Sequence, residues 1–212
     1  MAKSKTGILG PFYGKVGPVI GSHWKGINYI KSVNTKQPKK PSTAQLANQA
    51  KFKFMNQWLE PFHPYVTVGF FGQHHNRSEI NYAFQLNYRE ALIGTYPNFS
   101  IDYTKVCLSR GVLKVPQIAQ MQIIEPASLQ LNWLIETGAL AAHNDQLMLV
   151  LFAPDLHLAD GSVGMARRSD GSLLYRYASR LVGHEVEVYA SFIALNRKRV
   201  SDSVYLGRIL LP

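Results

Sequence analysis

Glycines at positions 7, 10, 14, 17 and 21, with prolines at 11 and 18, limit how the chain can begin to fold. Glycine and proline destabilise a helix interior more than any other residues, so this stretch cannot form a helix with a stripe of small side chains. A phosphate-binding loop needs four residues between its glycines and a Ser or Thr after its lysine. The segment Gly10-Pro-Phe-Tyr-Gly14-Lys15-Val16 has three residues and a valine, which excludes that loop. We therefore predict an extended, glycine-rich arm whose backbone can approach a partner closely.

Lysines concentrate in the same part of the chain. Residues 1–53 contain ten lysines, no arginine and no acidic residue, and the whole chain carries a net charge of +10. Residues 54–212 therefore have 13 basic and 13 acidic residues and no net charge. This asymmetry predicts a polyanion such as nucleic acid, or an acidic protein surface, as the partner, and a homo-oligomer or larger assembly is also expected. The alternative is a basic arm that only improves solubility.

Two β-prone stretches, residues 19–24 and 27–33, flank Lys25-Gly26 and predict a β-hairpin. Its lysine and aromatic side chains are of the kind that contact nucleic acid without reading its sequence, and the lack of arginine argues against base-specific readout. The alternative is that aromatic residues of the hairpin dock it onto the following helices. The predicted residues for binding a partner or nucleic acid are Lys15, Trp24, Lys25, Tyr29, Lys31, Lys36, Lys39 and Lys40.

Residues 42–98 predict a helical hairpin. Ser42 opens a capping box, apolar residues then recur at helical spacing, and two prolines end this first helix near Glu60. Ser78 is the expected N-cap of the second helix and Gly94 its C-cap.

Beyond about residue 99 the pattern changes to short segments in which apolar and polar residues alternate, which is typical of strands with one buried face. Asp160-Gly161 and Asp170-Gly171 are expected hairpin turns. This density of strands predicts an immunoglobulin- or fibronectin-like β-sandwich, with a small barrel as the alternative. The predicted strands are 105–108, 120–125, 129–135, 146–152, 163–167, 173–177, 185–195 and 204–211.

The expected fold class is thus α+β, in three regions. These are a basic, glycine-rich arm with a β-hairpin (1–41), a helical hairpin (42–98) and a β-sandwich (99–212).

The sequence lacks the patterns that indicate an enzyme. It has no G-x-S-x-G elbow, and its one cysteine, Cys107, lies in a predicted strand as a buried structural thiol. His74 and His75 are neighbours in a polar loop without further ligands at metal-binding spacing. We predict no catalytic residue, cofactor or metal. Without an apolar run of membrane-spanning length or a signal peptide, we expect no membrane association and a cytoplasmic or virion-associated location.

Several blocks of the chain resemble an uncharacterised bacterial family of unknown function. They are GILGPFYGKVGPVIGSHWKGINYIKS, KPSTAQLANQAKF, GTYPNFSIDYTKVCLSRG and SDSVYLGRI, and the similarity extends over the whole chain. The family resemblance implies no catalytic residue. A looser similarity, over residues 15–60, is to small phage structural proteins, in which a basic hairpin also precedes a helix with this pattern.

These observations lead to two hypotheses about function. The first is a non-enzymatic structural or assembly protein, of phage or mobile-element origin, that engages a partner through its basic arm. The alternative is a nucleic-acid-binding protein that uses the lysine-rich first 53 residues without sequence preference.

Overall fold

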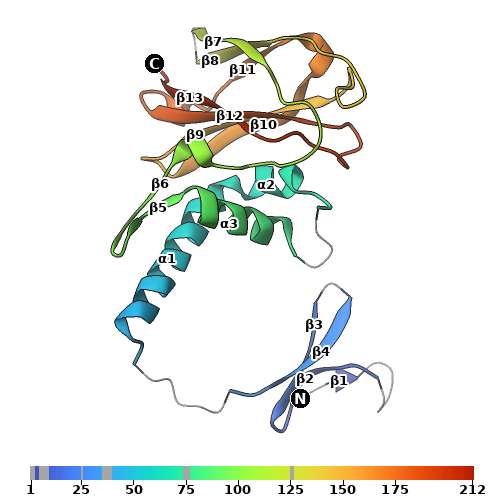
Figure 1. Cartoon of the computed structure of the whole chain (residues 1–212), viewed down its shortest axis with the longest axis vertical. Coiled ribbons are helices and arrows are strands. Elements are labelled where there is room, and N and C mark those ends of the chain that lie inside the picture. Colours follow the sequence, from blue (N-terminus) through green and yellow to red (C-terminus); the bar gives the residue numbers. More distant parts are fainter. Residues whose placement is uncertain (1–2, 5–9, 25, 35–39, 74–76, 125–126) are drawn as a thin grey trace. The chain divides into compact units, whose positions relative to one another are not determined.

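The computed structural model describes residues 3–4, 10–24, 26–34, 40–73, 77–124 and 127–212. The chain divides into two compact units, Met1–Ser42 and Thr43–Pro212 (Figure 1). The segments 42–98 and 99–212, which the sequence predicted as separate regions, contribute to one hydrophobic cluster in the second unit.

The first unit contains an antiparallel sheet of four strands in the order β1-β2-β3-β4. The predicted hairpin is confirmed, because β3 and β4 pair from Val19 opposite Ser32 to Trp24 opposite Ile27. Between β2 and β3 the chain turns at Gly17, whose φ of +52° lies in the left-handed region that glycine adopts at little cost. The strands are β1 (Lys3–Ser4), β2 (Phe12–Val16), β3 (Val19–Trp24) and β4 (Ile27–Ser32).

Helices open the second unit. The first of them, α1 (Thr43–Leu59), ends where predicted and is followed by the 3-10 turn η1 (Glu60–Phe62) and by α2 (His63–Gly69). The prolines at 61 and 64 occupy the first turns of η1 and α2, where a missing N–H costs nothing. The helix α3 (Glu79–Glu90) has the predicted N-cap, since the Asn81 N–H donates to Ser78 Oγ at 3.2 Å.

The prediction that Gly94 is the C-cap of α3 was wrong. The helix ends at Glu90, and Gly94 instead lies in the strand β5 (Leu92–Thr95), opposite Phe99 in β6 (Asn98–Ile101). A Cβ on Gly94 would lie 2.4 Å from the carbonyl oxygen of Asn98, so this glycine permits the close approach of the two hairpin strands.

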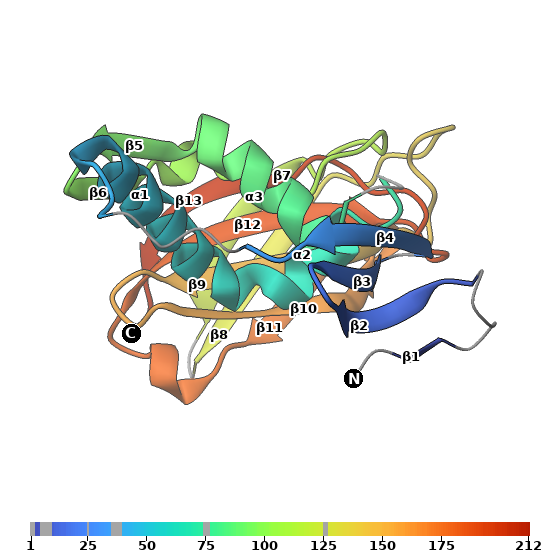
Figure 2. The same cartoon turned by 90° about the horizontal axis from the view of Figure 1, so that it is seen from below.

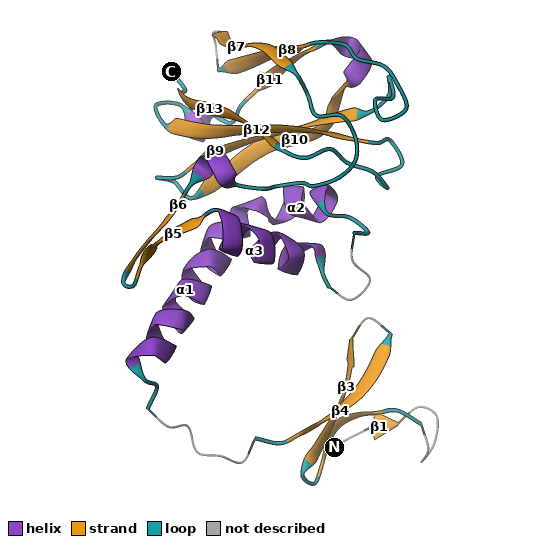
Figure 3. Cartoon of the chain, in the orientation of Figure 1, coloured by secondary structure: helices purple, strands orange, loops and turns teal. Residues whose placement is uncertain are grey.

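The rest of the second unit is made of two packed sheets (Figure 3). The central sheet has the order β10-β9-β12-β13, and the outer sheet has the order β11-β8-β7. Three 3-10 turns, η2 (Tyr103–Lys105), η3 (Arg168–Asp170) and η4 (Ser179–Leu181), connect strands. The strands are β7 (Ile118–Ile124), β8 (Ser128–Trp133), β9 (Gln146–Ala153), β10 (Leu158–Arg167), β11 (Ser172–Arg176), β12 (Glu185–Ile193) and β13 (Val204–Leu210).

The central sheet is covered on both faces. Along β9, Val150 and Phe152 belong to the cluster shared with the helices, whereas Leu149 and Leu151 belong to the cluster shared with the outer sheet. Burial on both faces explains the uninterrupted apolar sequence of this strand, QLMLVLFA. Figure 2 shows the helices lying across the central sheet, and the predicted α+β class with a C-terminal β-sandwich is confirmed.

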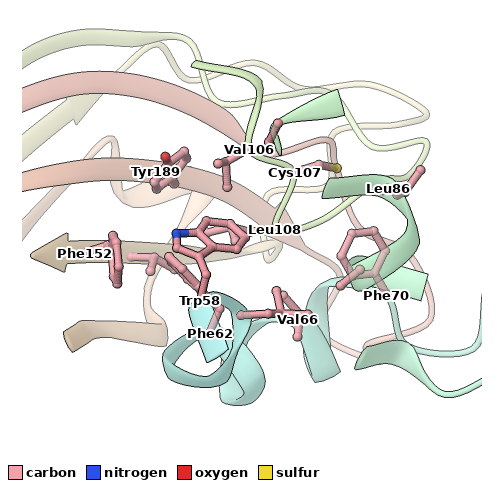
Figure 4. Close-up of a cluster of buried hydrophobic side chains, with 14 of the residues drawn as sticks. Trp58, Phe62, Val66, Phe70, Leu86, Val106, Cys107, Leu108, Phe152 and Tyr189 are labelled. Atoms are coloured by element: carbon pink, nitrogen blue, oxygen red, sulfur yellow. The ribbon is translucent and has the colours of Figure 1, made fainter. Parts of the chain in front are cut away.

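The cluster beneath the helices is largely aromatic. Figure 4 shows Trp58, Phe62 and Phe70 from the helical segment together with Phe152 and Tyr189 from the central sheet. All five side chains are at most 5% exposed, so the helices are held to the sheet by a shared core.

Three strand-level predictions were wrong. Residues 105–108 do not form a strand, since η2 ends at Lys105 and the chain then continues without regular structure. Asp160-Gly161 is not a turn but lies inside β10, where a Cβ on Gly161 would be 2.1 Å from the Leu149 carbonyl oxygen. This Asp-Gly pair therefore permits close strand approach. Asp170-Gly171 does form a turn, with a φ of +67° at the glycine, but it is not the predicted hairpin turn, because it connects β10 of the central sheet to β11 of the outer sheet.

Cys107 is buried, as predicted, although not on a strand. Its N–H donates to Asn87 Oδ1 at 2.8 Å, and its thiol lies 3.3 Å from the carbonyl oxygen of Ser109. Burial raises the pKa of this thiol to about 11, so it stays protonated near neutral pH. These contacts fit a structural thiol.

Candidate partner-binding face

The strand register decides which side chains of the first unit lie together. Residues directly opposite each other in an antiparallel sheet share a face. Lys15 lies opposite Ile20, and Ile20 lies opposite Lys31. The next pairs on the same face are Ser22 with Tyr29 and Trp24 with Ile27. We call this surface the basic-aromatic face, and its residues are Lys15, Ile20, Ser22, Trp24, Ile27, Tyr29 and Lys31.

The basic-aromatic face is open to solvent. Trp24 and Tyr29 are each 43% exposed and Ile27 is 54% exposed, while Lys15 and Lys31 are exposed as well. Tyr29 and Lys31 are two residues apart on one strand, which places them about 7 Å from each other. The face therefore presents ammonium groups beside flat rings within the reach of one ligand.

A small polar cluster joins β2 to the hairpin. Tyr13 donates its hydroxyl hydrogen to Asn28 Oδ1 at 3.2 Å, and His23 Nδ1 lies 2.8 Å from the same oxygen. The rings of Tyr13 and His23 also meet edge to face, with 6.2 Å between their centres. These bonds hold the three main strands in register without an apolar core.

No hydrophobic side chain is buried among the described residues of the first unit, in which Gly21 alone is classed as buried. All six residues of β4 are exposed, and its outer edge is unpaired within the described strands. A small sheet is normally stable only when one face packs against another layer. Among the described residues of the first unit, no second layer covers this sheet.

Four of the predicted binding residues, Lys15, Trp24, Tyr29 and Lys31, come together on the basic-aromatic face. Lys40 is exposed in the segment before α1 and is not part of the face. Lys25, Lys36 and Lys39 lie outside the described residues, as do His74 and His75.

One pair in the second unit was not recognisable from sequence. His184 Nδ1 and Asp155 Oδ2 are hydrogen-bonded, although 29 residues separate them, because the β9–β10 turn lies beside the start of β12. The bond to His184 lowers the pKa of Asp155. In the part of the chain that the structure describes, no three His, Cys, Asp or Glu side chains are grouped to hold a metal ion. None of the described helices has the length and apolar character needed to cross a membrane.

Comparison with known proteins places the chain in a family. A family of unknown function (DUF6266) matches residues 11–207, and the chain belongs to this family. The match begins before the basic-aromatic face and ends within β13, so it includes both units and confirms the whole-chain family resemblance. The comparison with curated proteins finds no match.

Proposed function

We propose that this member of the DUF6266 family is a non-enzymatic structural or assembly protein whose first unit is completed by a partner. The observation that carries the proposal is that the sheet of the first unit is largely exposed. Gly21 is the one buried residue among its described residues. Such a sheet gains stability when a partner covers it. A phage or mobile-element origin, and a cytoplasmic or virion-associated location, belong to the same proposal.

The charge of the first unit selects the kind of partner. Residues 1–42 contain eight lysines and no acidic residue, so a polyanion is attracted and a second copy of the same face is repelled. A protein surface rich in Asp and Glu and a nucleic acid both meet this requirement.

Hydrogen exchange of the full chain tests the proposal. Amides of β3 and β4 should exchange rapidly in the free protein, and should become at least about 10-fold slower when oligo-dT or polyglutamate is added. Amides of β9, which is buried on both faces, serve as the internal control and should not change. Unchanged exchange of β3 and β4 with both polyanions would contradict a partner that covers this sheet.

A second candidate function, sequence-independent binding of single-stranded nucleic acid, is favoured by one observation. Lys15 and Lys31 share a face with Trp24 and Tyr29. Lysines neutralise phosphates while aromatic rings stack on unpaired bases, and every base has a ring to stack. A patch that bound only an acidic protein would need the lysines but not the flat rings.

Fluorescence anisotropy with a labelled dT20 strand tests this second function. We expect the Lys15→Glu/Lys31→Glu variant to bind at least about 10-fold more weakly, and its slope of log K against log salt to become about 1.4 units shallower. Trp24→Ala and Tyr29→Ala should each weaken binding by about 5-fold or more, because each removes a stacking platform. The charge-matched control is Lys198→Glu/Arg199→Glu, in an exposed turn of the second unit.

Two outcomes would separate the candidates. Equal affinity of the wild type and the Lys15→Glu/Lys31→Glu variant for dT20 would refute nucleic-acid binding through this face. If β3 and β4 were then protected by polyglutamate alone, the partner would be an acidic protein surface and the assembly proposal would stand.

A further inference from the structure

The second unit contains a cavity of about 550 Å³ in which aromatic rings from separate elements meet. This volume lies within the range of small-molecule sites, which are usually concave and mostly apolar. Its ring-bearing walls are Phe54 and Trp58 from α1, Phe99 from β6, Tyr103 from η2 and Phe152 from β9. All of these residues belong to the unit Thr43–Pro212, so the cavity is independent of the basic-aromatic face.

The aromatic walls are held by contacts with one another and with the core. Phe152 is 1% exposed, and its ring centre lies 6.4 Å from that of Trp58 and 6.1 Å from that of Tyr103. The ring centres of Phe54 and Phe99 lie 5.9 Å apart. Because these rings are fixed by packing, the cavity exists without a ligand and needs little rearrangement to accept one.

The lining indicates the charge of the ligand. None of the residues described as lining this cavity is Lys, Arg, Asp or Glu. The lining side chains that carry a polar atom are Gln57, Trp58, Ser100, Tyr103 and His157. A charged ligand would lose its hydration without gaining a counter-charge, which is costly. An uncharged molecule that stacks against aromatic rings therefore matches this cavity best.

His157 adds a directional polar group. Its φ of +50° is in the left-handed region, which is unfavourable for a residue with a Cβ, and such outliers concentrate at functional sites. His157 Nε2 lies 2.8 Å from the carbonyl oxygen of Gln57 in α1. A carbonyl oxygen can only accept, so Nε2 carries the hydrogen, and in the neutral ring Nδ1 is left as an acceptor. Within the described residues Nδ1 has no hydrogen-bond partner.

We propose that this cavity binds an uncharged small molecule that carries aromatic rings and an N–H or O–H donor. The rings pack between Trp58, Phe99 and Phe152, and the donor bonds to His157 Nδ1 at the rim. This site goes beyond the proposed function, because it does not use the basic first unit.

The probe N-phenyl-1-naphthylamine tests the proposal on the full chain, since it is neutral, has aromatic rings and one N–H donor, and fluoresces more strongly in apolar surroundings. We expect saturable binding of one probe per chain. Ser100→Trp and Gln57→Trp place a large ring at the exposed rim of the cavity and should each weaken binding at least about 10-fold. Ser172→Trp, at an exposed position of β11, is the matched control and should bind like the wild type.

His157→Phe tests the donor requirement separately. It keeps a ring at the rim but removes the acceptor, so we expect binding to weaken by about 5-fold, as for one lost hydrogen bond. The same variant should leave binding of N-methyl-N-phenyl-1-naphthylamine, which has no N–H donor, unchanged. Absence of probe binding to the wild type, or equal binding by Ser100→Trp, Gln57→Trp and Ser172→Trp in chains that melt like the wild type, would overturn the proposal.

Discussion

Replacing Arg168 with methionine is expected to lower the free energy of unfolding of the second unit by about 3–5 kcal/mol. The Arg168 side chain is 1% exposed, and its Nε lies 3.2 Å from Oδ2 of Asp145, which is also buried. Nη2 donates to the Lys114 carbonyl oxygen at 2.8 Å, and the guanidinium lies 3.8 Å from the centre of the Phe192 ring. The substitution removes these bonds and leaves the Asp145 carboxylate buried without its counter-charge.

Urea denaturation followed by far-ultraviolet circular dichroism measures this loss, provided that the slope with urea concentration is unchanged. The matched control is Arg197→Met in the exposed turn after β12, which should change stability by less than about 0.5 kcal/mol. Adding Asp145→Leu to Arg168→Met should recover part of the loss, because the uncompensated carboxylate is then removed. A loss below about 1 kcal/mol for Arg168→Met would show that the pair does not stabilise this unit.

Replacing Phe152 with alanine is expected to cost about 3–5 kcal/mol as well, for a different reason. Phe152 lies on the helix-facing side of β9, and its ring centre is 4.6 Å from that of Phe62 and 6.4 Å from that of Trp58. Alanine at this position leaves a void between the helices and the central sheet. The loss comprises the transfer free energy of the ring and the cost of the unfilled space.

Urea denaturation of Phe152→Ala should show an earlier midpoint for the helical signal at 222 nm. Because the described helices all lie in the second unit, this signal reports the unit in which Phe152 is buried. Phe71→Ala is the control, since Phe71 is 52% exposed and should contribute less than about 0.5 kcal/mol. If both variants were destabilised equally, the helices and the sheet would not be held together through Phe152.

Features that depend on neighbouring residues were predictable. The β3–β4 hairpin follows from two β-prone stretches around a glycine turn, and the Ser78 cap follows from a residue type and its position. The hairpin register also places Trp24, Tyr29 and Lys31 on one face, because alternation along a strand is a local property. Lys15 joins them only through the pairing of β2 with β3, which the sequence did not predict.

Features that depend on distant contacts were predicted wrongly or not at all. Asp160-Gly161 has the sequence of a turn, but the backbone of β9 passes too close to Gly161 for any side chain there. The bond from His157 to Gln57 joins residues 100 positions apart. The buried pair of Arg168 with Asp145 joins the residue that follows β10 to the residue that precedes β9. No pattern of residue types within one segment specifies such long-range contacts.

The sequence by itself determined the α+β class, the basic and acid-free first part, the β3–β4 hairpin and the beginnings of α1 and α3, because short-range periodicity, capping and charge depend on neighbouring residues. The helix α2 was not predicted. Only the tertiary structure decided that β9 is buried on both faces, that aromatic rings from four elements enclose a cavity and that the first sheet has no covering layer among its described residues. Burial and cavities arise where segments that are far apart along the chain pack together. Which segments pack together is not specified by the order of residues within a single segment.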